Sequence, residues 1–206
     1  EQHGSELASI TMEPLRSDLP QPGFLEGVRA LADEIGAVLI IDEISAGFRM
    51  NTGGMHLELG IKPDVAVFSK AMGNGYPIAT IIGKNKVMEA AQSTFISSTM
   101  WTERIGPTAG LKTLEIMKQK VSWEVITEKG KYIGERWRDL AKNYNLPIEC
   151  SGLPSLINFC IPVENWLKYK TLITQEMLKR GFLASNSVFV CIEHEQKIIN
   201  QYFQNL

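Results

Sequence analysis

Two stretches of this sequence, 37–43 and 62–70, are short apolar runs that each lead to a charged residue, Asp42 and Lys70. Their β-branched composition and flanking turn signals predict buried strands rather than helices. α/β proteins place their chemistry at the carboxyl ends of such strands. A lysine that loses its proton on burial is a nucleophilic amine able to form a Schiff base. An aspartate beside it could hold a pyridinium N–H, as pyridoxal phosphate requires.

Structural interpretations compete with this catalytic one. Asp42 and Lys70 could form a buried ion pair, or Lys70 could be exposed beyond the end of its strand, and spacing alone favours the ion pair. Glycines in the segment 73–75 could let the backbone approach a ligand, or could simply form a turn. The hydroxyl groups of 97–99 could bind phosphate, or could belong to a polar strand end.

The surrounding pattern predicts a strand–helix–strand unit that would position Asp42. We expect a strand over 7–12, a helix that begins after Gly23 and ends at Gly36, and then the Asp42 strand. After the Lys70 strand we expect a strand over 78–82, an extended piece over 95–99 and long helices from about 108. The rest of the chain is expected to form strands over 156–161 and 188–192, with helices that end at Gly181 and near 203.

These elements predict an α/β protein with two parts. Residues 1–120 would form the C-terminal part of a large α/β domain. Residues 121–206 would form a long connecting helix and a small α+β domain. The sequence starts without a methionine and runs directly into a strand-like segment, so we expect a fragment.

Composition excludes several functional classes. The 206 residues carry a formal net charge of −2 and no basic cluster, which argues against nucleic acid as a partner. No apolar run approaches the roughly 18 residues of a membrane span, and no signal peptide opens the sequence. Three cysteines without C-x-x-C spacing and three scattered histidines predict no disulfide framework and no metal site. A reducing cytoplasm is the expected location.

A longer pattern is more specific than any of these residues alone. It comprises Met12-Glu13-Pro14, the segment 22–27, a D-E-[IV]-x-x-G-F-R run over 42–49, P-D at 63–64 and S-K-x-[MI]-G-x-G-x-P over 69–77. The pattern resembles the class III aminotransferases, most closely the glutamate-1-semialdehyde aminomutase branch of the fold-type I pyridoxal-phosphate enzymes. The resemblance covers nearly the whole chain and is strongest from residue 7 to residue 110.

The resemblance implies a role for five residues. Lys70 would form the Schiff base with pyridoxal 5'-phosphate and then move protons, and Asp42 would keep the pyridine nitrogen protonated. Ile44 would pack on one face of the ring. Ser45 stands where many relatives carry a glutamine near the phenolic oxygen of the cofactor. Thr99 matches the threonine that reaches the cofactor phosphate in the other subunit, which implies a homodimer with shared active sites.

The implied activity is pyridoxal-phosphate-dependent transfer of an amino group from a small-molecule donor to a carbonyl acceptor of the semialdehyde or keto-sugar type. One alternative is an intramolecular aminomutase of the glutamate-1-semialdehyde type, and another is a non-catalytic fragment that serves as a dimerisation module. Two departures leave the substrate open: the loop before Pro22 lacks a G-E-x-G run, and 101–107 replaces the usual asparagine–proline pair. In relatives, a preceding segment of comparable length carries the phosphate loop and the stacking aromatic residue, so we expect this chain to be the C-terminal half of such an enzyme.

Overall fold

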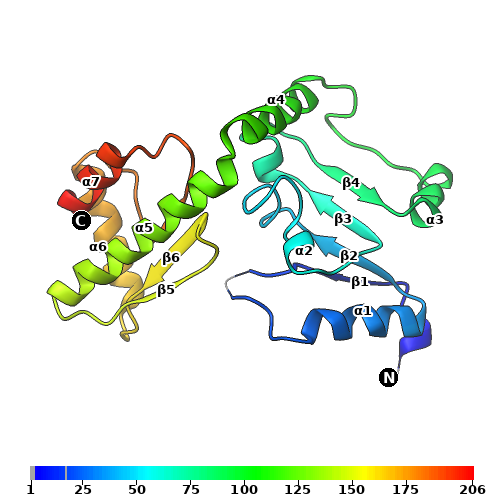
Figure 1. Ribbon diagram of the computed structural model, residues 1–206, viewed down its shortest axis with the longest axis horizontal. Coiled ribbons are helices and arrows are strands. Elements are labelled where there is room, and N and C mark those ends of the chain that lie inside the picture. The colour runs from blue at the N-terminus through cyan, green and yellow to red at the C-terminus, as the bar shows by residue number, and fades with distance from the viewer. Residues whose placement is uncertain (1–2, 17) are drawn as a thin grey trace. The chain divides into compact units, whose positions relative to one another are not determined.

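The computed structural model describes residues 3–16 and 18–206, and its contacts separate two units, Glu1–Val121 and Ser122–Leu206 (Figure 1). Each unit has its own sheet, four-stranded in the first and three-stranded in the second. Among the described residues, no helix is long and apolar enough to cross a membrane.

The sheet of the first unit has the strand order β1-β2-β3-β4. β1 (Ser9–Met12), β2 (Val38–Asp42) and β3 (Val65–Phe68) are parallel, and β4 (Thr80–Gly83) runs antiparallel to β3. The predicted strand–helix–strand unit is present, because α1 (Phe24–Ile35) connects β1 to β2. Figure 1 shows α1 running alongside this sheet.

Helix α1 is bounded by glycines because both of its ends need left-handed backbone. Gly23 has φ +84° and Gly36 has φ +71°, a region that residues with a Cβ atom rarely adopt. The apolar face of the helix places Leu25 and Ala32 against the strand residues Leu39 and Ile41. This packing forms the main core of the first unit.

Shorter helices complete the first unit. They are η1 (Gly4–Glu6), α2 (Met55–Glu58), η2 (Lys70–Met72), α3 (Asn85–Met88) and η3 (Glu89–Ser93), and they precede the longer α4 (Ile105–Lys120). The extended piece expected over 95–99 is irregular, and Phe95 in it is 94% exposed. The strand expected from residue 78 begins at Thr80, because Ile78 packs instead beside Phe68 and Met72.

Helix α4 lies against the loop that follows Lys70, and Gly106 allows this close approach. A Cβ atom at Gly106 would come within 2.6 Å of the Pro77 carbonyl oxygen. A Cβ atom at Gly110 would lie 3.8 Å from the Met72 carbonyl oxygen, which is ordinary contact. Since the two glycines are one helical turn apart, they share the face of α4 that meets the loop.

The second unit packs three helices with an antiparallel sheet of order β5-β6-β7. Its elements are α5 (Ser122–Asn143), β5 (Glu149–Ser151), β6 (Leu156–Cys160), α6 (Trp166–Lys179), β7 (Ser187–Phe189) and α7 (Gln196–Asn205). Strand β7 ends three residues earlier than predicted, although Val190 remains buried and donates its N–H to the Ser155 carbonyl.

The core of the second unit is built around Trp137 on α5, which is 1% exposed. Its ring lies 4.7 Å from that of Phe159 on β6, and its Nε1–H donates to the Tyr202 hydroxyl at 2.9 Å. Helix α5 also approaches the β5–β6 connection closely, because a Cβ atom at Gly130 would collide with the Pro154 carbonyl oxygen. Gly130 is therefore required by space and not by backbone conformation.

Candidate functional site

Asp42 and Lys70 lie at the same edge of the first sheet. Asp42 is the last residue of β2 and is in register with Val67 of the neighbouring parallel strand β3. Lys70 follows β3 by two residues and begins the single turn η2. The carboxyl edge of parallel strands is where α/β proteins bind ligands, so the fold brings both side chains to the expected place.

Lys70 differs from its predicted environment. The residue is exposed, and its Nζ donates to the Ser45 hydroxyl at 2.7 Å. In the part of the chain that the structure describes, Lys70 forms no ion pair with Asp42 or with any other carboxylate. The premise of a buried lysine and the alternative of a buried Asp42–Lys70 ion pair are therefore wrong, because β3 ends at Phe68 and the lysine lies beyond it.

The backbone at Lys70 is strained. Its φ of +40° lies in the left-handed region, which is uncommon for residues other than glycine and is retained only where surrounding contacts hold it. Those contacts are hydrogen bonds from the Asn74 and Gly73 N–H groups to the Lys70 carbonyl, at 3.0 and 3.2 Å. Ser69 adds a third restraint, since its hydroxyl donates to the Ile78 carbonyl at 2.7 Å. The lysine is thus presented from a fixed turn.

Asp42 keeps one carboxylate oxygen available. The side chain is half-buried, and its Oδ1 accepts the Ile44 N–H at 2.9 Å. Within the described residues, its second oxygen has no protein donor. A carboxylate that is half-buried and has one unused oxygen can accept an N–H group from a bound ligand.

Ile44 and Ser45 lie in a tightly held loop after β2. Arg49 Nε donates to the Ser45 carbonyl at 2.7 Å, and the Gly47 N–H donates to the Glu43 carbonyl at 2.7 Å. A Cβ atom at Gly47 would lie 2.8 Å from the Glu43 carbonyl oxygen and from the Phe68 ring. The G-F-R part of the motif therefore has a structural explanation, since it fixes the loop that carries Ser45.

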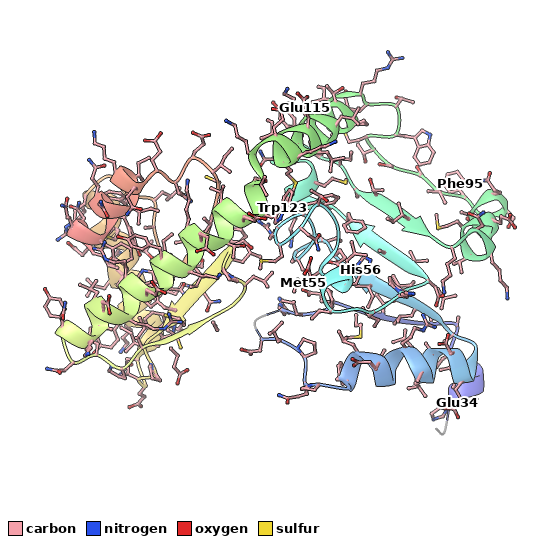
Figure 2. All side chains as sticks on the ribbon, viewed as in Figure 1. Glu34, Met55, His56, Phe95, Glu115 and Trp123 are labelled. Carbon is pink, nitrogen blue, oxygen red and sulfur yellow. The ribbon has the colours of Figure 1, made fainter. Side chains whose placement is uncertain are left out.

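Glu43 is a site-forming residue that the sequence reasoning did not single out. It is completely buried, and its carboxylate accepts the N–H groups of Met55 and His56 at 2.9 and 2.8 Å. The same carboxylate pairs with His56 Nδ1 at 2.7 Å. Figure 2 shows Met55 and His56 side by side on α2. Glu43 thus ties α2 to the end of β2, and its only sequence signal was its place within the D-E pair.

Asp64 lies at the edge of the first sheet opposite to the one that carries Asp42 and Lys70, and it holds the strands together there. Its carboxylate accepts Lys84 Nζ at 2.7 Å and both Arg29 Nη1 and the Leu39 N–H at 2.8 Å. Burial alone would raise the pKa of Asp64. The hydrogen bonds from Lys84, Leu39 and Arg29, with the positive charge of Arg29, outweigh it and lower the pKa from 3.8 to about 2. Asp64 therefore joins α1, β2 and the start of α3, and its role is structural.

Thr99 is not brought to this group. It is exposed, lies in the irregular segment before α4, and has no hydrogen bond to Asp42, Ile44, Ser45 or Lys70 among the described residues. The described residues contain no cluster of three or more metal-ligating side chains.

Sequence comparisons assign the chain to a family. The model of the family described as Aminotransferase class-III matches residues 1–187. The 3-aminobutyryl-CoA aminotransferase of Cloacimonas acidaminovorans is 33% identical over 182 residues, covering 85% of this chain and 44% of that protein. The glutamate-1-semialdehyde 2,1-aminomutase of Hyperthermus butylicus is 28% identical, covering 99% of this chain and 53% of that protein. The chain spans about half the length of these curated relatives.

Solved structures share the fold. A PLP internal aldimine form of the Sphingopyxis sp. MTA144 FumI protein has a TM-score of 0.92 at 23% identity, covering 99% of this chain and 51% of that one. The β-phenylalanine aminotransferase of Variovorax paradoxus has a TM-score of 0.82 at 22% identity, covering 99% and 52%. The predicted fold, that of the fold-type I pyridoxal-phosphate transferases, is confirmed. The chain belongs to the class III aminotransferase family.

Proposed function

We propose that this chain provides the lysine and the ring-nitrogen carboxylate of a pyridoxal-phosphate-dependent enzyme that transfers an amino group from a small-molecule donor to a carbonyl acceptor. One observation carries the proposal. Lys70 has an exposed amine without a carboxylate partner, and it lies at the sheet edge where Asp42 has an unused carboxylate oxygen. Membership of the class III family supports the same chemistry.

The amine and the carboxylate at this edge of the sheet fit pyridoxal 5'-phosphate. The group has an aldehyde that requires an amine and a ring nitrogen that requires an acceptor, and Lys70 and Asp42 supply one of each. When bound, pyridoxal phosphate withdraws electrons from the carbon that bears the amino group and so makes its proton removable. A solved relative described as a transaminase with PLP bound, with a TM-score of 0.85, shares the fold.

Each residue of the edge then has a separate task. Lys70 Nζ would bind the aldehyde carbon and, once released from it, hold and return a proton. Asp42 would accept the ring N–H through its unused oxygen and so favour the protonated ring. Ile44, half-buried beside Asp42, would cover one face of the ring. Ser45 would lie near the cofactor, and its short side chain contacts the Lys70 amine directly.

We propose a homodimer in which Thr99 serves the site of the partner subunit. The segment between η3 and α4, together with α4 itself, exposes several large apolar side chains, which are Phe95, Ile96, Trp101, Ile105 and Leu111. Exposed apolar surface of this kind is typical of an interface. Thr99 lies within this segment and is itself exposed, so a second copy that covers it would bring the threonine close to another protomer.

The acceptor is proposed to be a semialdehyde or a keto-sugar. The proposed location is a reducing cytoplasm, and three free cysteines support that proposal. An aminomutase is the second candidate function, because one relative is a glutamate-1-semialdehyde 2,1-aminomutase at 28% identity. The two candidates differ in a measurable way. An aminomutase isomerises a single substrate with no net donor or acceptor, whereas an aminotransferase requires a separate acceptor.

Trapping of the cofactor tests the proposal. The protein is incubated with pyridoxal phosphate, reduced with borohydride and digested, and the modified peptide is identified by mass spectrometry. We expect a pyridoxyl group on Lys70, its loss in Lys70→Ala, and its retention in the matched control Lys62→Ala, which removes another exposed lysine. Equal labelling of Lys70→Ala and wild type would show that the lysine is not the cofactor residue, and absence of any adduct would favour the non-catalytic dimerisation module.

A panel of amino donors and carbonyl acceptors then identifies the reaction. Donors are mixed with the cofactor-loaded protein first, and aldehydes and keto-sugars are added second, with the transferred nitrogen followed by mass spectrometry. Transfer of ¹⁵N from a donor to a separate acceptor supports the aminotransferase, and isomerisation of one substrate without any second acceptor supports the aminomutase.

A further inference from the structure

The Lys70 amine has a neutral partner. Its Nζ donates to the Ser45 hydroxyl at 2.7 Å, and this is its one hydrogen bond within the described part of the chain. A carboxylate partner would favour the charged ammonium form, whereas a hydroxyl can accept from an ammonium group and can also donate to a neutral amine. Ser45 can therefore hold the amine in both of its protonation states.

Ser45 is itself held in place on both sides. On one side, the Ile44 N–H is bound by Asp42 Oδ1 at 2.9 Å. On the other, the Ser45 carbonyl accepts Arg49 Nε at 2.7 Å, and Arg49 is part-buried at this contact. The hydroxyl is thus carried by a restrained loop, in contrast to a mobile serine on an open surface.

The restraint matters because a lysine side chain is flexible. Ordering its four-carbon stem costs rotamer entropy, so an exposed lysine without a partner samples many positions. At Lys70 the backbone is already fixed by its left-handed turn, and the hydroxyl fixes the other end of the side chain. The amine is therefore restrained at both ends before any ligand arrives.

A second hydroxyl lies next to Lys70 in the sequence, but it is used elsewhere. Ser69 Oγ donates to the Ile78 carbonyl at 2.7 Å. Among the described hydroxyl groups, only that of Ser45 contacts the amine. Because Ser69 restrains the turn of Lys70, the matched control is Ser93, an exposed serine of the same unit whose hydroxyl donates to the Ala90 carbonyl at 2.9 Å.

We infer that Ser45 is a positioning residue, whose hydroxyl orients the Lys70 amine in the cofactor-free protein and keeps it ready for the aldehyde of the cofactor. The inference rests on the proposed function for the identity of that aldehyde. The contact itself is a property of this chain alone, and it can be measured without cofactor.

Competitive acetylation of the cofactor-free protein tests the inference. Limiting acetic anhydride is applied from pH 7 to pH 10, and the acetylation of each lysine is quantified by mass spectrometry, with Lys62 as the exposed internal reference. Removal of the hydroxyl frees the amine from its one hydrogen bond within the described residues. Since the loss of one hydrogen bond of typical strength changes an equilibrium about 5-fold, we expect Lys70 in Ser45→Ala to react roughly 5-fold faster relative to Lys62.

Three further variants make the result specific. Ser45→Thr keeps the hydroxyl and should retain the wild-type rate, and Ser93→Ala should also retain it. Ser45→Cys keeps the size but provides only a weak acceptor, so it should behave like Ser45→Ala and replaces that variant if the alanine protein does not fold. An unchanged relative rate of Lys70 in both Ser45→Ala and Ser45→Cys would overturn the inference, as would an equal change in Ser93→Ala.

The trapping experiment separates this inference from the proposed function. If wild type forms the Lys70 adduct but acetylation is indifferent to Ser45, the inference fails and the proposed function stands. If acetylation depends on Ser45 but no adduct forms, the positioning role is supported and the proposed cofactor is wrong. With both supported, Ser45→Ala should form the adduct several-fold more slowly than wild type, although its free amine is more reactive.

Discussion

Replacement of Asp64 by asparagine gives the sharpest test of what holds the first unit together. The side chain is 13% exposed and accepts three hydrogen bonds, two of them from cations. An amide cannot form ion pairs with Arg29 and Lys84, and one of its two polar ends is a donor. At neutral pH we expect Asp64→Asn to lose about 2 kcal/mol of unfolding free energy. This value follows from the lowering of the Asp64 pKa from 3.8 to about 2, at about 1.4 kcal/mol for each tenfold change in proton affinity.

The same pKa predicts a dependence on acid. The folded-state pKa is below the unfolded-state value, so the unfolded chain takes up the proton first as the pH falls. The contribution of Asp64 is therefore complete above about pH 5 and is lost progressively as the pH falls through 3.8 towards 2. Asp64→Asn should lack this part of the acid dependence, so its unfolding free energy should approach that of wild type near pH 2.

Urea unfolding followed by circular dichroism, repeated from pH 2.5 to pH 7, measures both effects. Hydrogen exchange of peptides from β2 assigns both effects to the first unit. This exchange should be about 30-fold faster in Asp64→Asn than in wild type at neutral pH, because the Leu39 N–H is bound by Asp64. Asp33→Asn is the matched control, because Asp33 also pairs with Arg29 but is 67% exposed and should change stability by less than about 1 kcal/mol. An acid dependence identical in Asp64→Asn and wild type would refute the reasoning.

Three further substitutions probe other contacts. Gly130→Ala places a methyl group against the Pro154 carbonyl and should lower the free energy of unfolding by about 1–3 kcal/mol, which a lower melting temperature would show. Trp137→Ala empties the core of the second unit and should cost about 3–5 kcal/mol in urea unfolding, so a cost under 1 kcal/mol would contradict the packing. Glu43→Gln places an amide donor against a backbone N–H beside His56 and should lower the free energy of unfolding by about 1–3 kcal/mol. Faster hydrogen exchange of the α2 amides would locate this effect.

The strands and their functional edge were predictable because they depend on local composition. Apolar β-branched runs placed β2 and β3 to within a few residues, and the charges after them identified the edge that carries Asp42 and Lys70. Helix α1 was predictable for a similar reason, since glycines marked both of its ends. Patterns with short periods need no knowledge of distant contacts.

The environment of Lys70 was not predictable in the same way. Its partner, Ser45, is 25 residues away, and the contact depends on the path of a loop fixed by Arg49 and Gly47. The prediction of a buried lysine assumed that the strand continues to residue 70, whereas a positive φ turns the chain there. The role of Thr99 depends on a second protomer and stays a prediction.

The face of α4 that carries Gly106 and Gly110 extends the set of residues on which the lysine depends. Gly106 lets that helix rest on the loop carrying Lys70, and Gly110 lies on the same face, although they are 36 and 40 positions further along the chain. A graft that moved only the motif 69–77 into another scaffold would leave this support behind, and the loop would lose the surface against which it is packed. Engineering of the loop that carries Lys70 therefore has two targets, the loop itself and the face of α4 that lies against it. A bulkier residue at Gly106 is a way to shift the lysine without altering any residue near it in sequence.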